Sequence, residues 1–265
     1  MAKYILSLFI IGLLLGCNIT KTIKAPFECE LLDNPIQNFK FDVFGNLYTI
    51  DLKNRLKVYD KDLNFLFEYY NNSLGNISYV DVTNPKKIML FFSGFQRIIF
   101  VDDALSEIGR YQGEFNIIAA GNSSDNNIWI YDGLDYRLKK ISKNSKVIIE
   151  SNPVESYIQL DIHPDFIVEQ NNMVFMVEEG RGIAIFDNFG NYSSYLPLED
   201  SGSIIVKDKS IVYTKGGILY QQLTENTLAQ TRKIKTIPAG AEIVRIFNKS
   251  IFYTENRCLK KITLD

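Results

Sequence analysis

Histidine and tryptophan are almost missing from this chain of 265 residues, which has one of each. A single histidine, His163, excludes a zinc site made from three histidines of the same chain. The sequence also lacks the Gly-x-Ser-x-Gly elbow of serine hydrolases and the glycine-rich loops that bind phosphate. Asp161 and His163 form a pair that could orient a general base. A loop histidine beside Pro164 is the simpler interpretation, so we predict no catalytic residue.

A strong excess of charge of either sign is missing as well. The chain has 29 basic and 31 acidic residues, for a net charge of −2. This balance indicates no basic surface of the kind that binds nucleic acid, and we expect no nucleic-acid partner. Two short basic clusters, at 137–140 and 232–235, are interpreted as solvated strand faces or edges. No segment has the pattern of a long amphipathic helix.

The sequence does contain an apolar segment that recurs six times. The copies are five residues long and rich in valine, isoleucine, phenylalanine and tyrosine, as half-buried strands prefer. They begin at Leu47, Ile88, Ile128, Met173, Ile211 and Ile251, which gives steps of 41, 40, 45, 38 and 40 residues. A fixed period of this size in short β-rich units is typical of a β-propeller.

Each copy is followed by a polar turn and a second alternating strand, as in residues 47–51 followed by 56–60. This pattern predicts an antiparallel hairpin. A third strand often follows, as at 65–69, and the strand that enters the unit makes four. We therefore predict an all-β chain in which residues 26–265 form a six-bladed β-propeller of four-stranded antiparallel blades.

The N-terminus has the features of a bacterial lipoprotein signal. Lys3 precedes an apolar run, and the run ends in Leu14-Leu15-Gly16-Cys17, which matches the lipobox. This match predicts a signal peptide at 1–16, lipid on Cys17 and a tether at 17–25. Each buried CH₂ of an acyl chain contributes about 0.8 kcal/mol to membrane binding. The alternative is an ordinary secretion signal with an incidental cysteine.

The residues after Cys17 predict where the anchor resides. Asn18 stands where the inner-membrane retention signal of such lipoproteins has aspartate, and residues 18–24 include no acidic residue. Surface-exported lipoproteins of the Bacteroidota carry acidic residues there. We expect a lipid anchor in the outer membrane, on its periplasmic face.

The turn at 42–48, Asp-Val-Phe-Gly-Asn-Leu-Tyr, resembles the blade consensus of NHL-like six-bladed propellers. Residues 126–132 are a second copy without the glycine, whereas the Gly-His and Trp-Asp signatures of WD40 propellers are missing. The chain after Cys17 also resembles the propeller lipoproteins of the Bacteroidota, above all at 81–92 and 100–109. This resemblance implies a location in the cell envelope and implies no catalytic residue.

Propellers often close the ring by adding a strand from the chain start to the last blade. On this resemblance the segment 26–32 supplies the fourth strand of blade six, which would place Cys29 beside Cys258. We predict a disulfide between Cys29 and Cys258, which the oxidising periplasm permits. The alternative is two buried thiols that never meet.

Two functional classes remain open. Lactonase-like propellers hold calcium at the central tunnel, and Asp51, Asp132 and Glu178 could converge there or could bond their own turns. The single histidine excludes the zinc-dependent propeller lyases. We expect no metal and no cofactor, and we favour a non-enzymatic, lipid-anchored scaffold that binds other envelope proteins, such as a subunit of an outer-membrane assembly or secretion complex. The alternative is a lactonase-like or ligand-binding propeller with a calcium or sugar site in the tunnel.

Overall fold

The computed structural model describes residues 29, 31–32, 35–224 and 231–264. Within these ranges the chain forms 23 strands and two short 3₁₀ helices. The strands make six separate antiparallel sheets, each of which follows the order of the sequence. The predicted signal peptide (1–16), Cys17 and the tether (17–25) lie outside the described residues.

Five of the sheets have four strands. They are β1 (Ile36–Phe41), β2 (Leu47–Asp51), β3 (Leu56–Tyr59) and β4 (Phe65–Tyr69); β5 (Tyr79–Asp81), β6 (Ile88–Phe92), β7 (Arg97–Val101) and β8 (Glu107–Tyr111); β9 (Ile117–Asn122), β10 (Ile128–Asp132), β11 (Arg137–Ile141) and β12 (Val147–Glu150); β13 (Phe166–Gln170), β14 (Met173–Glu178), β15 (Gly182–Asp187) and β16 (Tyr192–Pro197); β17 (Ser201–Lys207), β18 (Ser210–Lys215), β19 (Ile218–Leu223) and β20 (Arg232–Thr236). The sixth sheet has β21 (Val244–Phe247), β22 (Ser250–Glu255) and β23 (Cys258–Thr263), and the helices are η1 (Ser93–Phe95) and η2 (Val154–Ser156).

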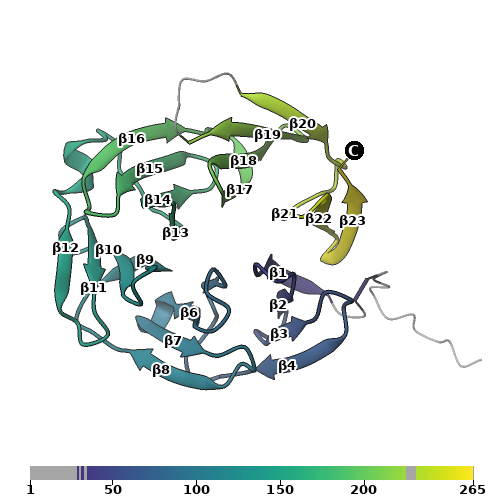
Figure 1. The fold of residues 1–265 in the computed structure, drawn as a ribbon, viewed down its shortest axis with the longest axis horizontal. Helices are drawn as coiled ribbons and strands as arrows, with labels where there is room; N and C mark the ends of the chain where they lie inside the picture. The colour runs from purple at the N-terminus through teal and green to yellow at the C-terminus, as the bar shows by residue number, and fades with distance from the viewer. Residues whose placement is uncertain (1–28, 30, 33–34, 225–230, 265) are drawn as a thin grey trace, which may run out of the picture.

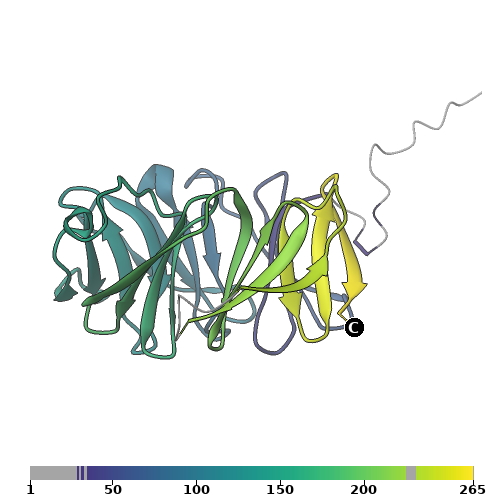
Figure 2. The ribbon, with the colours of Figure 1, turned by 90° about the horizontal axis from the view of Figure 1, so that it is seen from above.

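The six sheets stand around a common axis, which Figure 1 views end-on and Figure 2 at right angles. The first strand of each blade lies nearest the axis, and in the five four-stranded blades the fourth strand lies on the rim. The predicted six-bladed β-propeller is therefore confirmed. We call the side with the turns between first and second strands face 1, and the side with the turns between second and third strands face 2.

The six apolar repeats are the second strands of the blades. Every residue of β2, β6 and β10 is buried. A second strand has hydrogen-bonded neighbours within its blade and packs against the adjacent blades on its two faces. Because both faces are buried, its sequence is a continuous apolar run. Trp129 on β10 illustrates this packing, because its side chain joins Val174 and Met176 of blade four in one core cluster.

The Asp-x-x-Gly-Asn turn has a clear physical basis at 42–46. Asp42 Oδ1 accepts hydrogen bonds from the backbone N–H groups of Phe44 and Asn46, each at 2.9 Å. The fourth residue, Gly45, takes a φ of +92°, which favours glycine. A Cβ on Gly45 would also meet the Phe247 ring of blade six at 2.8 Å. This glycine therefore serves both the turn and the contact between the first and last blades.

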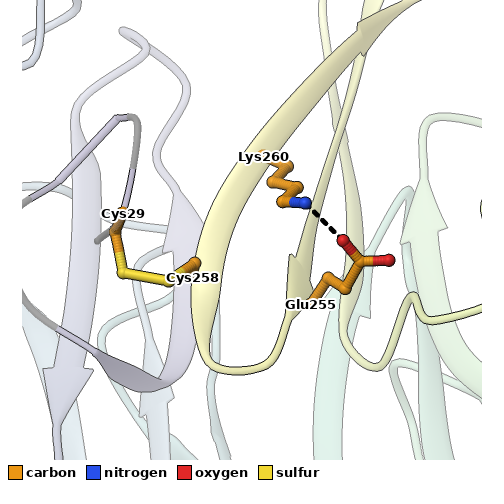
Figure 3. Close-up of a disulfide and its surroundings, with 4 residues drawn as sticks. All are labelled: Cys29, Glu255, Cys258 and Lys260. Atoms are coloured by element: carbon orange, nitrogen blue, oxygen red, sulfur yellow. Dashed lines mark hydrogen bonds and ion pairs between the residues drawn. A yellow bond between two sulfur atoms is a disulfide. The ribbon is translucent and has the colours of Figure 1, made fainter. Parts of the chain in front are cut away.

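The ring is closed where blade six meets blade one. Cys29 and Cys258 form a disulfide with a Cα–Cα distance of 5.1 Å, 229 residues apart in sequence (Figure 3). The N–H of Ile36 on β1 donates to the carbonyl of Arg257 at 2.9 Å. Phe41 on β1 stacks on Phe247 of β21, with ring centroids 5.2 Å apart. These contacts join the two ends of the described chain.

The chain start meets blade six without forming the predicted fourth strand among the described residues. Among the described residues this blade has three strands, and no strand is assigned at Cys29, Leu31 or Leu32. Leu32 is buried in a cluster with Phe252 and Leu259 instead of continuing along the outer edge of β23. The chain start thus closes the ring through a disulfide, one backbone hydrogen bond and apolar packing.

No helix among the described residues has the length and hydropathy needed to cross a membrane.

We predict that replacing Cys258 with serine lowers the free energy of unfolding by about 5 kcal/mol or less. The cross-link spans 229 residues, and in the chain-entropy model so long a loop contributes on the order of 5 kcal/mol, usually less in practice. Urea unfolding of the wild type with and without reductant, beside Cys258→Ser, measures the effect. Two free thiols in the oxidised wild type, detected by mass spectrometry, would contradict the prediction.

Candidate functional site

Six residues, one from each blade, form a layer around the tunnel. Each lies on the first strand of its blade and pairs with the second residue of the apolar repeat. They are Lys40, Asp81, Gly121, Glu169, Ile205 and Arg245. The layer therefore holds two cations and two carboxylates.

The two carboxylates of the layer are bound by blade three. Asp81 Oδ2 accepts a hydrogen bond from the Asn122 backbone N–H at 2.8 Å. Glu169 Oε2 accepts one from Ser123 Oγ at 2.6 Å, and its carboxylate also accepts from Trp129 Nε1. These carboxylates join neighbouring blades and are structural.

The two cations of the layer have no such partners. Lys40 on β1 and Arg245 on β21 form no salt bridge with any described residue. The Lys40 ammonium lies 3.5 Å from the centroid of the Tyr79 ring and 5.2 Å from that of Phe166. Arg245 donates one hydrogen bond, to the carbonyl of Val244 at 2.9 Å. Both cations are therefore open to a ligand.

Aromatic rings divide the tunnel into two cavities. Tyr79 of blade two and Phe166 of blade four stack with centroids 5.0 Å apart and an interplanar angle of 5°. Together with Lys40 and Arg245 they line both cavities, so these four side chains form a waist. The cavity toward face 2 has a volume of about 340 Å³, and the cavity toward face 1 about 490 Å³.

The waist is poorly solvated, and this changes the proton affinities of its groups. Burial, followed by the charge of Arg245, lowers the pKa of Lys40 to about 7, while Asp81 and Glu179 act in the opposite direction. Burial also lowers the pKa of Arg245 and raises the pKa of Tyr79 well above its usual value. The free protein thus holds two basic groups in a place that disfavours positive charge.

Polar groups line the face-2 cavity around the waist. They are Asn38, Ser78, Ser93, Asp165 and Glu179. Asp165 Oδ2 accepts from the Glu179 N–H at 2.8 Å, and Glu179 Oε1 accepts from the Ile204 N–H at 3.1 Å. Burial, together with the charges of Glu179 and Glu178, raises the pKa of Asp165.

The three carboxylates considered for calcium are the last residues of β2, β10 and β14, and each is hydrogen-bonded there. Asp51 Oδ1 accepts from the backbone N–H groups of Lys53 and Arg55, at 2.9 and 3.0 Å. Asp132 Oδ2 accepts from Lys139 Nζ at 2.8 Å. Glu178 Oε2 accepts from the His163 N–H at 2.9 Å. In the part of the chain that the structure describes, no three His, Cys, Asp or Glu side chains gather as a metal site.

His163 lies on the surface. Its side chain is 62% exposed, and Nε2 is 3.2 Å from Asp161 Oδ2. It is absent from the residues that line the two tunnel cavities. This position agrees with a loop histidine.

The interpretation of the basic cluster at 137–140 as a solvated face was wrong for two of its residues. Lys139 and Lys140 are each 5% exposed. Lys139 Nζ lies 2.8 Å from Asp132 Oδ2, and Lys140 Nζ lies 4.8 Å from the centroid of the Trp129 ring. Turn carboxylates and an aromatic face compensate for burial of these two charges, which composition alone does not show.

Sequence analysis missed the residues of the waist. Lys40 and Arg245 are single charges within apolar inner strands, and no motif spacing marks them. One signal was available: both pair with the second residue of a repeat, Tyr48 and Phe252. Aligning the first strands through those repeats places the two cations at equivalent positions in neighbouring blades.

Comparison with known proteins supports the fold. No family model and no curated protein matches the sequence. A structure of streptogramin B lyase is similar with a TM-score of 0.58 and 14% identity, covering 88% of this chain and 83% of that chain. A catalytically inactive H270A virginiamycin B lyase from Staphylococcus aureus with quinupristin has a TM-score of 0.57 and 12% identity. The match covers 87% of this chain and 84% of that chain. A chain of the mitotic checkpoint complex has a TM-score of 0.56 and 14% identity, and the match covers 85% of this chain and 73% of that chain.

These likenesses show a shared β-propeller fold, and at such identities they show no more than the fold.

We predict that Glu169→Gln lowers the free energy of unfolding at pH 7 by about 1–3 kcal/mol, because a buried hydrogen-bonded carboxylate is lost. Burial alone would raise the pKa of Glu169, but hydrogen bonds from Ser123, Ser124 and Trp129 and the charge of Lys140 leave it lowered. A lowered folded pKa stabilises the protein above the unfolded pKa, and this stabilisation is lost as pH falls through the folded value.

Urea unfolding from pH 7 down to pH 3 measures this effect. The difference between wild type and Glu169→Gln should shrink below the ordinary glutamate pKa of 4.5. Glu150→Gln is the control, because its carboxylate forms a partly exposed ion pair with Arg137, and such pairs contribute about 0–1 kcal/mol. A difference in the free energy of unfolding that stays constant across this pH range would contradict a lowered pKa of Glu169.

Proposed function

We propose that this chain is a non-enzymatic, lipid-anchored scaffold of the bacterial cell envelope that binds other envelope proteins through the rim of blade one. The observation that carries this proposal is the exposed apolar strand β4. Phe65, Leu66 and Phe67 are 56%, 40% and 44% exposed and follow one another on this strand.

The other rim strands are less apolar. Among the described rim strands, β12 exposes Val147 and Ile148, and β8 exposes Ile108. No large apolar residue on β16 or β20 is exposed. Exposed apolar patches on single-chain proteins mark interaction sites more often than chance, so β4 is the strongest candidate on the rim.

Among the described strands β4 pairs only with β3, so its outer edge has backbone groups that no described strand pairs. A register shift between Val58 and Tyr59 places Phe65 opposite Tyr59, and their rings meet at 5.9 Å. An extended segment of a partner can add to such an edge as a further strand, with apolar side chains in alternation. We infer that the partner offers an extended, apolar strand.

The sequence supports the membrane part of this proposal through its lipobox. The short tether between Cys17 and Cys29 would keep the propeller close to the membrane surface. A chain of similar fold occurs in the mitotic checkpoint complex, an assembly of proteins. No cluster of carboxylates in the described residues favours a calcium site.

We predict that Cys17→Ser abolishes lipid attachment. Only a thiol takes the diacylglycerol thioether, so serine cannot replace it. Labelling of cells with radioactive palmitate, followed by purification of the wild type and the variant, measures the modification. Palmitate on the serine variant, or none on the wild type, would contradict the predicted anchor.

We predict that the double change Phe65→Ser and Phe67→Ser abolishes binding of the partner protein, because it removes the apolar side chains of β4. The change is on the surface, so the thermal unfolding midpoint should stay within a few degrees of wild type. Cross-linking in native membranes followed by affinity purification measures partner recovery. The matched control, Val147→Ser with Ile148→Ser on β12, should recover the same partners as wild type. Undiminished recovery with the β4 variant would contradict the proposal.

A further inference from the structure

We propose that the face-2 cavity of the tunnel binds a small zwitterion, with its anionic group between Lys40 and Arg245 and its cationic group at Asp165 and Glu179. The ligand class is an amino acid or a similar molecule that carries a carboxylate and an amine. This inference goes beyond the scaffold function and does not depend on it.

The first argument comes from the cations at the waist. Lys40 and Arg245 occupy equivalent positions on the first strands of neighbouring blades, opposite Tyr48 and Phe252. Neither forms a salt bridge with a described residue. Both side chains are half-buried, and a charge withdrawn from water without a partner is costly. Two such charges side by side form a site for a carboxylate, which arginine binds with two parallel hydrogen bonds.

The second argument comes from the carboxylates at the mouth. Asp165 and Glu179 line the same cavity, and each uses one oxygen to accept a backbone hydrogen bond. Asp165 Oδ1 and Glu179 Oε2 accept no hydrogen bond from any described residue. Both residues are exposed at the opening of the cavity. They leave two oxygens for a cationic group of the ligand.

The opposite charges line one cavity but do not pair. Arg245 is held by the Val244 carbonyl, whereas Glu179 is held by the Ile204 N–H on β17. No salt bridge joins Arg245 to Glu179 among the described residues, so a ligand with both charges can satisfy both ends. A simple anion would be attracted by Lys40 and Arg245 but repelled by the carboxylates at the opening of the cavity. A zwitterion therefore fits the cavity better than an anion.

The size and lining of the cavity agree with a small ligand. Its volume of about 340 Å³ lies within the range of small-molecule sites, roughly 300–1,000 Å³. Tyr79 and Phe166 give it an apolar floor, suited to the methylene groups of a ligand. Asn38 and Ser78 add hydrogen-bonding groups to the wall.

The proton affinity of Lys40 provides an independent readout. Its pKa is lowered to about 7 by burial and by Arg245 on β21, against the effect of Asp81 on β5 and of Glu179 beyond β14. Tyr79 is the other titratable group at the waist, with its pKa raised by burial. A bound carboxylate favours the charged amine, so binding above pH 7 should draw a proton onto Lys40.

Isothermal titration calorimetry with a series of ω-amino acids tests the proposal. The probes are glycine, β-alanine, 4-aminobutyrate and 6-aminohexanoate, with acetate and butylammonium as singly charged controls. We expect one member of the series to bind at least tenfold more tightly than either control, because only a zwitterion reaches both ends. Titration at pH 8 in two buffers of different ionisation enthalpy should show proton uptake.

Three variants and a control separate the two ends of the site. Arg245→Met and Glu179→Gln should each weaken binding of the best probe at least tenfold. Glu179→Gln should leave the affinity for acetate unchanged or higher. Lys40→Met replaces a half-buried amine with an apolar side chain, so it should fold, and it should abolish proton uptake. Arg232→Met, on the exposed surface of β20, should bind as wild type does.

Three results would overturn the proposal. The first is no binding of any probe at 10 mM to wild type. The second is binding of acetate as tight as that of the best zwitterion, which would remove the role of the mouth carboxylates. The third is undiminished binding to Lys40→Met and Arg245→Met, which would place the ligand elsewhere.

Discussion

The ring depends on the contact between blade six and blade one. The other blades follow one another along the chain, so a short connection holds each next to its neighbour. The last contact brings together residues as far apart as Cys29 and Cys258, and its closure has the largest entropic cost. A disulfide, the hydrogen bond from Ile36 to Arg257 and the stacked rings of Phe41 and Phe247 offset that cost.

The same contact carries a destabilising feature. Lys40 and Arg245 lie on the two blades that meet there, and the charge of Arg245 helps to lower the pKa of Lys40. Two cations in a poorly solvated tunnel oppose closure, whereas an apolar pair would favour it. Charges that destabilise a fold without serving its packing are typical of functional sites. The disulfide therefore stabilises the ring at the place where the candidate site weakens it.

The sequence predicted the parts of this fold that repeat. Strands such as β10, buried on both faces, must be apolar throughout, and turns such as 42–46 need aspartate and a left-handed residue, so both appear as patterns. The waist could not be predicted in this way, because Lys40 and Arg245 become neighbours only when the ring closes. The burial of Lys139 was missed for a related reason: its partner Asp132 belongs to the preceding strand and had been considered for calcium.

Blade one contributes to both proposed surfaces, with Lys40 on β1 and Phe67 on β4 of a single hydrogen-bonded sheet. Coupling between two sites requires an element with two arrangements that each ligand favours differently. Hydrogen bonds join β1 to β4 through β2 and β3 in one arrangement, so binding at the rim should not by itself alter the tunnel. The contact between blades six and one brings Lys40 and Arg245 to neighbouring positions. A ligand that bridges Lys40 and Arg245 binds only the closed ring, and by mass action it would stabilise that state.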